Sequence, residues 1–492
     1  MIVNNVRNIS GFLKSVDKRW GSEMRYVHAV ILVLLLVSFV HAQQRWKKTF
    51  GGTDNDYGRY GLQTADSGYV VTGYAMSYGA GYTDFYLIKT NGSGDLVWFN
   101  TFGDTGYQSA YSVRQTADRG YVMTGVTMPP SGYAFNVRIV KTDASGDQEW
   151  EKTYGGDADD QGFDIQQTSD GGYIITGVTR SFGAGTNDVL LLRTTEAGDS
   201  LWFRNCGGNG SDMGYSILEN SDHSYTIAGF TSGIGGFNED VYLVKISYTG
   251  DTIWSRTFGG DGDDEGLCVS PTADGGYIIT GLFHSSGGTG NDVYLIKTDA
   301  SGDSLWSRTY GGQYYDVGKS VQQTSDGGYI VAGVKYVAAG DADVYLIKTN
   351  ASGDTLWTRT FGGTGTDGAN SVHQTLDGGY IVAGYTSSFG AGSYDVWLIK
   401  TDANGRAAVE EPGGNRQKES SILNATPNPF ASFARVPGHE TERFEVYNVS
   451  GKKQGTFAGN RIGEKLPPGV YFVRRVGEHG RSLRAVKISS GQ

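Results

Sequence analysis

Short apolar runs alternate with clusters of glycine and aspartate along most of the chain. In one representative segment, four runs rich in Val, Ile, Tyr and Thr occupy residues 306–310, 320–324, 328–333 and 343–349. This composition is typical of β-strands separated by tight turns. The last run is apolar at successive positions, Val-Tyr-Leu-Ile, so we expect both faces of that strand to be buried. The pattern therefore predicts small sheets of four strands, each packed between two others.

The same four-stranded unit occurs seven times. Its first tryptophan recurs every 51 or 52 residues, at Trp46, Trp98, Trp150, Trp202, Trp254, Trp306 and Trp357. Four strands at this period are typical of a β-propeller blade. The seventh unit ends at Gly405 without a tryptophan strand, whereas the run 46–50 opens the repeats with no strands before it. We therefore expect an all-β, seven-bladed β-propeller over 43–405 in which the first strand completes the seventh blade.

The turns of the unit are also repeated. Asp-Gly-Gly lies between the second and third runs, and glycine permits the positive φ angles that a tight hairpin uses. The units resemble secreted bacterial propeller repeats with a D-G-G-Y-I-x-x-G core and a T-[FY]-G-G turn, found here at 326–333 and 309–312. The resemblance covers 46–405 and implies the fold, but it implies no particular ligand.

The first residues have the parts of a secretory signal peptide. After Met24 come one arginine, a twelve-residue apolar run at 29–40, and Val-His-Ala before Gln43. These features predict cleavage between Ala42 and Gln43, with translation starting at Met24. The apolar run is short for a membrane span, so we expect 1–42 to be a signal peptide and the mature chain to have no transmembrane segment. An uncleaved anchor is the alternative.

The repeat pattern stops after Gly405. Residues 406–420 form a polar stretch with Glu-Glu-Pro-Gly-Gly, which is typical of a linker. Short alternating runs follow at 425–430, 444–451, 466–473 and 484–489. They predict a small C-terminal β-sandwich over 421–492.

This tail carries four ordered motifs. They are P-N-P-F at 427–430, V-Y-N-V-S-G-K at 446–452, L-P-P-G-V-Y-F-V-R at 466–474 and K-I at 487–488. The tail is similar to the type A C-terminal sorting domain of the type IX secretion system. The resemblance implies passage through the outer membrane of a Gram-negative-type bacterium, the secretion machinery as a partner, and often removal of the domain with attachment to surface glycolipid. An immunoglobulin-like adhesive domain is the alternative.

Composition and charge narrow the function. Of 492 residues 76 are glycine but only 9 proline, so the glycine belongs to turns rather than to a disordered chain. Residues 43–405 contain 22 Lys+Arg and 42 Asp+Glu, a net charge of −20. An acidic body argues against nucleic acid as a partner. Cys206 and Cys268 occupy unlike positions of the repeat, so no disulfide is expected.

The sequence contains no strong catalytic signature. H-E-x-x-H, G-x-S-x-G, C-x-x-C and a phosphate loop are absent, and the seven histidines occupy unlike positions. We therefore predict no catalytic residues and a binding or structural protein rather than an enzyme. A secreted hydrolase, such as a glycan-degrading propeller, is the alternative from another class; it would need a pair of carboxylates in a groove.

Aspartates recur at two places in the unit. One series stands before the innermost strand, at Asp56, Asp160, Asp212, Asp264, Asp316 and Asp367, with Gln108 in unit two. The other opens the Val-Tyr-Leu-Ile strand, at Asp84, Asn136, Asp188, Asp240, Asp292, Asp343 and Asp395. Such residues accept hydrogen bonds from backbone N–H groups at turns. The alternative for the first series is a hard cation such as Ca²⁺; no other cofactor is expected.

A basic residue ends the Val-Tyr-Leu-Ile strand in every unit. The series is Lys89, Lys141, Arg193, Lys245, Lys297, Lys348 and Lys400. Because the body is acidic, we expect these cations to pair with carboxylates between blades rather than to bind a polyanion.

A ligand site is expected where the units differ, because propeller faces recognise partners through variant loops. Unit two replaces its Gly-rich loop with a segment that contains Tyr133 and Phe135, and unit four replaces Asp-Gly-Gly with a segment that contains His223. The aromatic pair is suited to stacking on a sugar or a peptide; drift in a tolerant loop is the alternative. The sequence thus predicts a secreted or cell-surface monomer with a surface glycan or protein ligand.

Overall fold

The chain folds as two compact units, Met1–Val409 and Glu410–Gln492, each described here by itself. The computed structural model describes residues 45–130, 132–232, 238–284, 290–338, 340–407, 443–448, 452–458, 469–475 and 484–488. The predicted signal peptide, with Ala42 and Gln43, and most of the predicted linker lie outside these residues. Within the described ranges no helix is long and apolar enough to cross a membrane.

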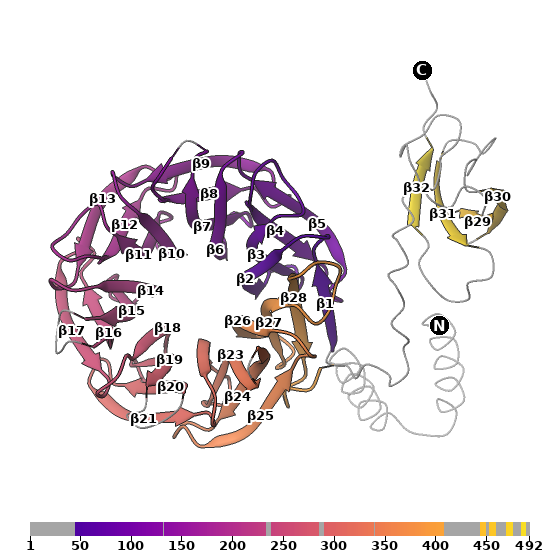
Figure 1. Ribbon diagram of the computed structural model, residues 1–492. Helices are drawn as coiled ribbons and strands as arrows, with labels where there is room; N and C mark the ends of the chain where they lie inside the picture. Colours follow the sequence, from indigo (N-terminus) through magenta and orange to yellow (C-terminus); the bar gives the residue numbers. More distant parts are fainter. Residues whose placement is uncertain are drawn as a thin grey trace, which may run out of the picture. The chain divides into compact units, whose positions relative to one another are not determined.

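The first unit is a ring of seven four-stranded antiparallel sheets, the blades, around a central axis (Figure 1). We call the region along this axis, between the innermost strands, the channel. The innermost strands are β2 (Asp56–Gln63), β6 (Tyr107–Gln115), β10 (Asp160–Gln167), β14 (Asp212–Glu219), β18 (Glu265–Pro271), β22 (Asp316–Gln323) and β26 (Asp367–Gln374). The second strands are β3 (Tyr69–Ala75), β7 (Tyr121–Met128), β11 (Tyr173–Thr179), β15 (Tyr225–Thr231), β19 (Tyr277–His284), β23 (Tyr329–Ala338) and β27 (Tyr380–Thr386).

The outer half of each blade has the same regularity. The third strands are β4 (Asp84–Thr90), β8 (Asn136–Thr142), β12 (Asp188–Thr194), β16 (Asp240–Ile246), β20 (Asn291–Thr298), β24 (Asp341–Thr349) and β28 (Asp395–Thr401). The outermost strands are β5 (Leu96–Phe102), β9 (Gln148–Tyr154), β13 (Ser200–Cys206), β17 (Thr252–Phe258), β21 (Ser304–Tyr310), β25 (Thr355–Phe361) and β1 (Trp46–Phe50). The predicted seven-bladed propeller is confirmed.

The ring closes as predicted. Strand β1 pairs with β28 in the register Trp46↔Lys400 to Phe50↔Val396, so the first strand is the outermost strand of the seventh blade. Blade six shows where the sequence pattern was less accurate: β22 begins four residues before the expected position 320. Its first half, Asp-Val-Gly-Lys, is too polar and too rich in glycine to be recognised as a strand.

The core lies between adjacent blades rather than within one. Every residue of β4 is buried, which confirms the prediction that the third strand has two covered faces. Leu87 of blade one, for example, belongs to the same apolar cluster as Val113 and Met123 of blade two. Each blade therefore depends on both neighbours for its stability.

One aromatic contact repeats around the ring. The tryptophan of each outermost strand packs against the first tyrosine of the next blade's second strand, as Trp46 does against Tyr69 with ring centroids 5.4 Å apart. The other pairs are Trp98–Tyr121, Trp150–Tyr173, Trp202–Tyr225, Trp254–Tyr277, Trp306–Tyr329 and Trp357–Tyr380. A turn glycine covers each indole; a Cβ at Gly94 would lie 2.8 Å from the Trp46 ring. These contacts explain why Trp, Tyr and Gly recur together.

In the Asp-Gly-Gly turn, only the first glycine has positive φ. Gly327 has φ 81°, and Ser67, Arg119 and His223 take the left-handed conformation at the equivalent positions of three other units. The second glycine is required by space instead, since a Cβ at Gly328 would lie 2.1 Å from the carbonyl oxygen of Thr349. The expectation that this turn uses positive φ is confirmed, at the first glycine alone.

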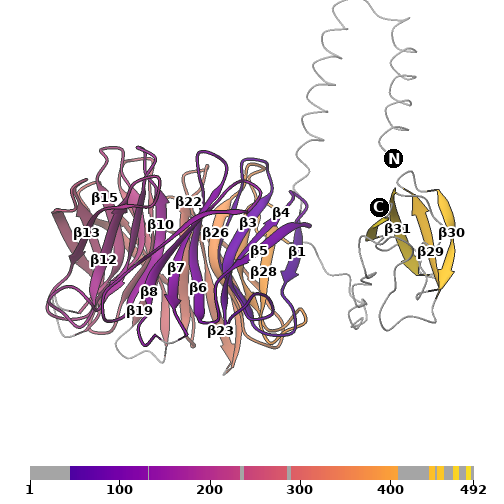
Figure 2. The same cartoon turned by 90° about the horizontal axis from the view of Figure 1, so that it is seen from above.

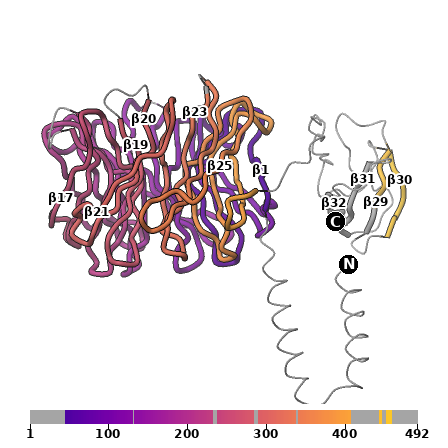
Figure 3. The backbone as a smooth tube through the Cα atoms, turned by 90° about the horizontal axis from the view of Figure 1, so that it is seen from below, coloured from indigo at the N-terminus to yellow at the C-terminus, as the bar shows by residue number. Residues whose placement is uncertain are grey.

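Seen edge-on, the blades stand side by side and their connections gather on two faces (Figure 2, Figure 3). The DGG face carries the turns from first to second strands and from third to outermost strands. The loop face carries the loops from second to third strands and from each blade to the next. The channel runs between these two faces.

The C-terminal unit contains one described sheet. Its strands are β29 (Arg443–Asn448), β30 (Lys453–Ala458), β31 (Gly469–Arg475) and β32 (Arg484–Ile488), in the order β30-β29-β31-β32. Three of them match predicted runs, whereas β30, Lys-Gln-Gly-Thr-Phe-Ala, is too polar to have been recognised. The predicted β-sandwich is not shown, because the described residues of this unit provide a single sheet and the run 425–430 lies outside them.

Candidate functional site

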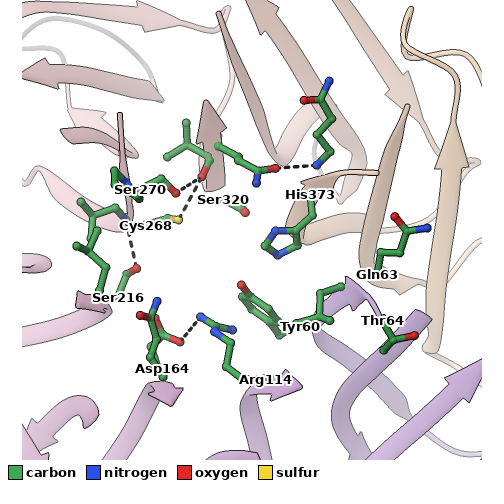
Figure 4. A pocket seen from close by; sticks show the side chains of 18 of the residues that line it. Tyr60, Gln63, Thr64, Arg114, Asp164, Ser216, Cys268, Ser270, Ser320 and His373 are labelled. Carbon is green, nitrogen blue, oxygen red and sulfur yellow. Dashed lines mark hydrogen bonds and ion pairs between the residues drawn. The ribbon is translucent and has the colours of Figure 1, made fainter. Parts of the chain in front are cut away.

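A cavity of about 540 Å³ occupies the part of the channel nearer the DGG face. Its wall is built from the second halves of the innermost strands, so that every blade contributes (Figure 4). We call this cavity the chamber. Positions along an innermost strand are counted from its aspartate, or Gln108 in blade two, as position 1; the chamber is lined mainly from positions 5 and 7.

Position 5 holds mostly small polar side chains, several of which connect neighbouring blades. The residues are Tyr60, Ser112, Asp164, Ser216, Cys268, Ser320 and Ser371. Ser216, Ser320 and Ser371 each accept a hydrogen bond from the backbone N–H of position 6 in the next blade, at 3.2, 3.1 and 2.9 Å. These hydroxyls therefore satisfy the inner strands themselves.

Blades one to three depart from this pattern. Asp164 replaces the serine and accepts hydrogen bonds from Arg114 Nη2 at 2.8 Å, Ser112 Oγ at 2.8 Å and Ile217 N at 3.1 Å. The Arg114 guanidinium also lies 4.3 Å from the centroid of the Tyr60 ring, a cation–π contact. The ion pair is thus held rigidly at one side of the chamber wall, with its charges compensated.

His373 adds an unsatisfied nitrogen to the same region. Its ring lies 5.3 Å from the Tyr60 ring, and its Nε2 atom is buried without a hydrogen-bond partner among the described residues. Burial, with a smaller effect of the Arg114 charge, lowers the pKa of His373 to about 3. The imidazole is therefore neutral at physiological pH, and a buried polar atom without a partner is a place where a ligand group would be stabilised.

The chamber thiol has no nucleophilic character. Cys268 Sγ donates to the carbonyl oxygen of Val321 at 3.8 Å, and burial raises the pKa of the thiol. A protonated thiol is a poor nucleophile. Cys206 and Cys268 are both free, as expected.

Position 8 carries an inter-blade contact that sequence reasoning missed. Its side-chain oxygen accepts a hydrogen bond from a turn N–H of the preceding blade, as Gln323 Oε1 does from Ala273 N at 2.7 Å. The other acceptor–donor pairs are Gln115–Ala65, Gln167–Ala117, Glu219–Ser169, Gln374–Ser325 and Gln63–Leu376. We call these contacts the amide latch. Pro271 has no such group, and at that junction the Tyr277 hydroxyl instead donates to Asn220 Oδ1 at 3.0 Å.

Five of the six aspartates considered for a cation are turn acceptors in the structure, whereas both carboxylate oxygens of Asp316 are buried without a hydrogen-bond partner among the described residues. Asp56, Asp160, Asp212, Asp264 and Asp367 each accept a hydrogen bond from the second glycine N–H of a T-[FY]-G-G turn or its equivalent, at 2.7 to 2.9 Å. Burial, with a smaller contribution from the charge of Asp292 nearby, raises the pKa of Asp316 to about 6. Throughout the described ranges there is no group of three or more His, Cys, Asp or Glu that could hold a metal ion.

The basic series pairs within blades, not between them. Lys89 Nζ lies 2.8 Å from Asp66 of its own blade, at the Asp-Gly-Gly turn or its equivalent. The same pairing joins Lys141–Asp118, Arg193–Asp170, Lys245–Asp222, Lys297–Asp274, Lys348–Asp326 and Lys400–Asp377. The expectation of inter-blade pairing was therefore wrong. The physical reason is that the turn between the first and second strands folds back over the end of the third.

The variant loops do not form one site. Tyr133 is fully exposed on the loop face, where Phe135 meets the edge of Tyr107 at 5.5 Å. His223 lies on the DGG face, with Nδ1 3.0 Å from Ser169 Oγ and 3.2 Å from Glu219 Oε1. These three candidates thus belong to opposite faces of the ring, and none of them lines the chamber.

Comparisons with known proteins add the following. No protein-family model matches the chain. The regulatory protein FlaEY of Caulobacter vibrioides is 22% identical over 330 residues, which cover 57% of this chain and 34% of that protein. The chain therefore spans about a third of the length of this curated relative.

Solved structures with a similar arrangement have low sequence identity. Sqt1 from Chaetomium thermophilum is 11% identical, with a TM-score of 0.43 over 75% of this chain and 86% of that one. PorZ, a surface component of the type IX secretion system of Porphyromonas gingivalis, is 9% identical, with a TM-score of 0.36 over 85% of this chain and 65% of that one. Puromycin hydrolase is 11% identical, with a TM-score of 0.45 over 75% of this chain and 57% of that one. These values are too low to indicate a shared function.

Proposed function

We propose that this chain is an exported β-propeller that binds a ligand in its central channel. The observation that carries the proposal is the asymmetry of the chamber. Six of the blades share the amide latch, and serine predominates at position 5, yet Tyr60 and Asp164 replace that serine, and Arg114 and His373 stand beside them at position 7, which varies from unit to unit. Repetition of a side chain is explained by folding, whereas a cluster of non-repeated polar side chains around a cavity is suited to recognition.

Several features favour binding over hydrolysis. Asp164 is the single carboxylate among the described residues that line the chamber, and Arg114 engages it. A glycosidase needs two carboxyl groups about 5 to 9.5 Å apart, one of them free to move a proton. The protonated thiol of Cys268 and the low pKa of His373 also suit neither a nucleophile nor a general base at neutral pH.

The chamber proposal is tested by binding measurements on the full chain. A glycan array and a panel of chromogenic glycosides would be used together, the first for ligands and the second for the hydrolase alternative. His373→Phe keeps the ring volume and removes Nε2, so it should weaken any ligand held in the chamber at least fivefold. His284→Phe on the loop face is the matched control. Unchanged binding by the His373 variant would contradict the chamber, and turnover of a glycoside would favour the hydrolase.

Export is the second part of the proposal. The segment before Gln43 has signal-peptide features, and the ordered motifs of 421–492 resemble a type IX sorting domain. We infer a protein of the outer cell surface or medium that uses the type IX machinery as a partner. In a host with this pathway, removal of 421–492 should leave the protein in the periplasm, and fusion of the tail to an exported reporter should bring the reporter to the surface. Protease accessibility on intact cells measures both, and surface display of the truncated chain would support the adhesive-domain alternative.

A further inference from the structure

Every innermost strand contains a β-bulge at the same place. The register with the second strand is interrupted between positions 3 and 5 in all seven blades, so position 4 is left out of the hydrogen-bond ladder. The residues at this position are Arg59, Tyr111, Phe163, Tyr215, Leu267, Lys319 and Asn370. We call them the bulge ring. A bulge redirects a side chain, and bulges are frequent beside binding sites.

The bulge-ring side chains meet one another across blade boundaries. The Arg59 guanidinium lies 5.2 Å from the Tyr111 ring centroid, Tyr111 meets the edge of Phe163 at 5.4 Å, and Phe163 stacks on Tyr215 at 5.3 Å. Their strands, β2, β6, β10 and β14, are consecutive around the channel in Figure 1. Side chains from four separate sheets form such a chain of contacts because they converge toward the axis. All four are half-buried, so part of each remains accessible to solvent.

The row of rings continues in the other direction. Arg59 lies 4.6 Å from the Tyr57 ring, which stacks on Tyr385 at 4.1 Å, and Tyr385 meets Tyr394 at 5.8 Å. From Tyr394 to Tyr215, an aromatic arc therefore extends over blades seven, one, two, three and four, with Arg59 at its middle. Its members on the innermost strands lie on the loop-face side of the chamber, because they precede the residues that line the chamber along each strand.

Arg59 is the charge of this arc. Among the described residues its Nε atom is buried without a hydrogen-bond partner, and none of the ion pairs found there involves Arg59. Lys319 is the other cation of the bulge ring and lies two blades away, in blade six; burial, and to a smaller extent the charge of Arg59, lowers its pKa, whereas the charge of Glu265 acts in the opposite direction. A half-buried guanidinium with an unsatisfied N–H is costly unless a ligand anion completes it. Arg59 thus differs from the Lys and Arg residues of the basic series, which form ion pairs, although the body has a net charge of −20.

We propose that the aromatic arc binds an acidic oligosaccharide, with the C–H faces of its pyranose rings against the aromatic side chains and a uronate carboxylate against Arg59. This inference rests on the proposed binding role of the channel and names its ligand class. A uronic acid residue presents an apolar face and an anion within one ring, which matches a guanidinium group with aromatic rings on both sides of it. Stacked Tyr and Phe supply rigid contact area, and Arg pairs with a carboxylate through two N–H groups.

The test uses the full chain and defined hexasaccharides. Oligogalacturonate and oligoguluronate are the acidic probes, cellohexaose is the neutral probe, and hexaglutamate represents an acidic peptide; affinities come from titration calorimetry. We expect an acidic hexasaccharide to bind at least tenfold more tightly than cellohexaose or hexaglutamate. Arg59→Gln should weaken it tenfold to a hundredfold, as for loss of a charge-assisted hydrogen bond. Phe163→Leu should weaken it about threefold to tenfold.

Arg204→Gln, on the outermost strand β13, is the matched control and should leave the affinity unchanged. Circular dichroism and the melting temperature report whether each variant folds. If Arg59→Gln does not fold, two other measurements test the inference: the affinity of Phe163→Leu, and the affinity of the wild-type chain at high salt, which should be weaker. Acidic saccharide binding that ignores Arg59, or tighter binding of hexaglutamate, would overturn the inference. If neither acidic hexasaccharide binds, but a ligand found on the array binds and is weakened by His373→Phe, this inference is overturned and the channel proposal stands. If the array ligands bind the His373→Phe and Arg59→Gln variants as tightly as the wild-type chain, both proposals are overturned.

Discussion

Closure of the ring by β1 can be tested by removing that strand. Deletion of residues 43–52 would take away Trp46, which is 8% exposed, together with a five-residue ladder on β28. Large-to-small substitutions of a buried tryptophan alone cost about 3–5 kcal/mol. The total stability of a domain is typically about 5–15 kcal/mol, so we expect failure to fold or a fall in melting temperature of at least about 5 °C. Scanning calorimetry and gel filtration measure the two outcomes.

A permuted chain is the informative control. The Arg406 carbonyl accepts a hydrogen bond from Asp402 N at 3.0 Å, as the Asp354 carbonyl does from Asn350 N at 2.9 Å. Residues 44–52 placed directly after Arg406 would therefore bring Trp46 to the position that tryptophan occupies in the other blades, and stability should return. Val97→Ala, at a 57% exposed site of β5, should change little. Deletion without loss of melting temperature, or a permuted chain that does not recover, would refute the closure argument.

Three further outcomes are expected. Gln323→Ala removes one amide latch and should lower the free energy of unfolding by about 1 kcal/mol in urea titrations, whereas Gln148→Ala at an exposed site should not; equal losses would contradict the latch. The pKa of Asp316 is about 6 in the folded protein against its ordinary value of 3.8, so the free energy of unfolding falls as the pH rises between these two values. Asp292→Asn removes the facing charge and should therefore stabilise the protein at pH 7 but not at pH 4, and a gain that is independent of pH would count against this cause. Because the position-1 aspartates accept turn N–H groups, millimolar calcium or EDTA should not move the melting temperature, whereas a rise with the logarithm of free calcium would establish the cation site.

The repeat made the fold predictable from sequence because its main packing residues are chemically distinctive. Trp306, Tyr329 and the apolar run of β24 each occur once per unit, and each has one role between blades. The bulges left no such signal. A bulge adds one residue to a strand, and position 4 holds residues as different as Arg59, Phe163 and Leu267.

The site was harder to predict because it is assembled from single residues of separate units, at positions where the units differ. Arg114 and His373 occupy position 7 of blades two and seven, and only the curvature of the ring brings both beside Tyr60. The prediction of inter-blade charge pairing was wrong for a related reason. Lys89 has carboxylates at similar sequence separations on both sides, and the path of the turn at Asp66 decides which one it meets.

The bulge ring has a consequence for how such a protein can change over generations. Position 4 pairs with no residue of the second strand, so its side chain is not constrained by the strand pairing that keeps the seven units alike. A gene built of near-identical segments exchanges, gains and loses them by recombination, and each exchanged segment would carry its own position-4 residue into the lumen. Arg59 beside Tyr111 is then one of many residue combinations that the same scaffold tolerates. New specificities can arise by exchange of whole blades, because the exchange leaves the fold of each blade unchanged.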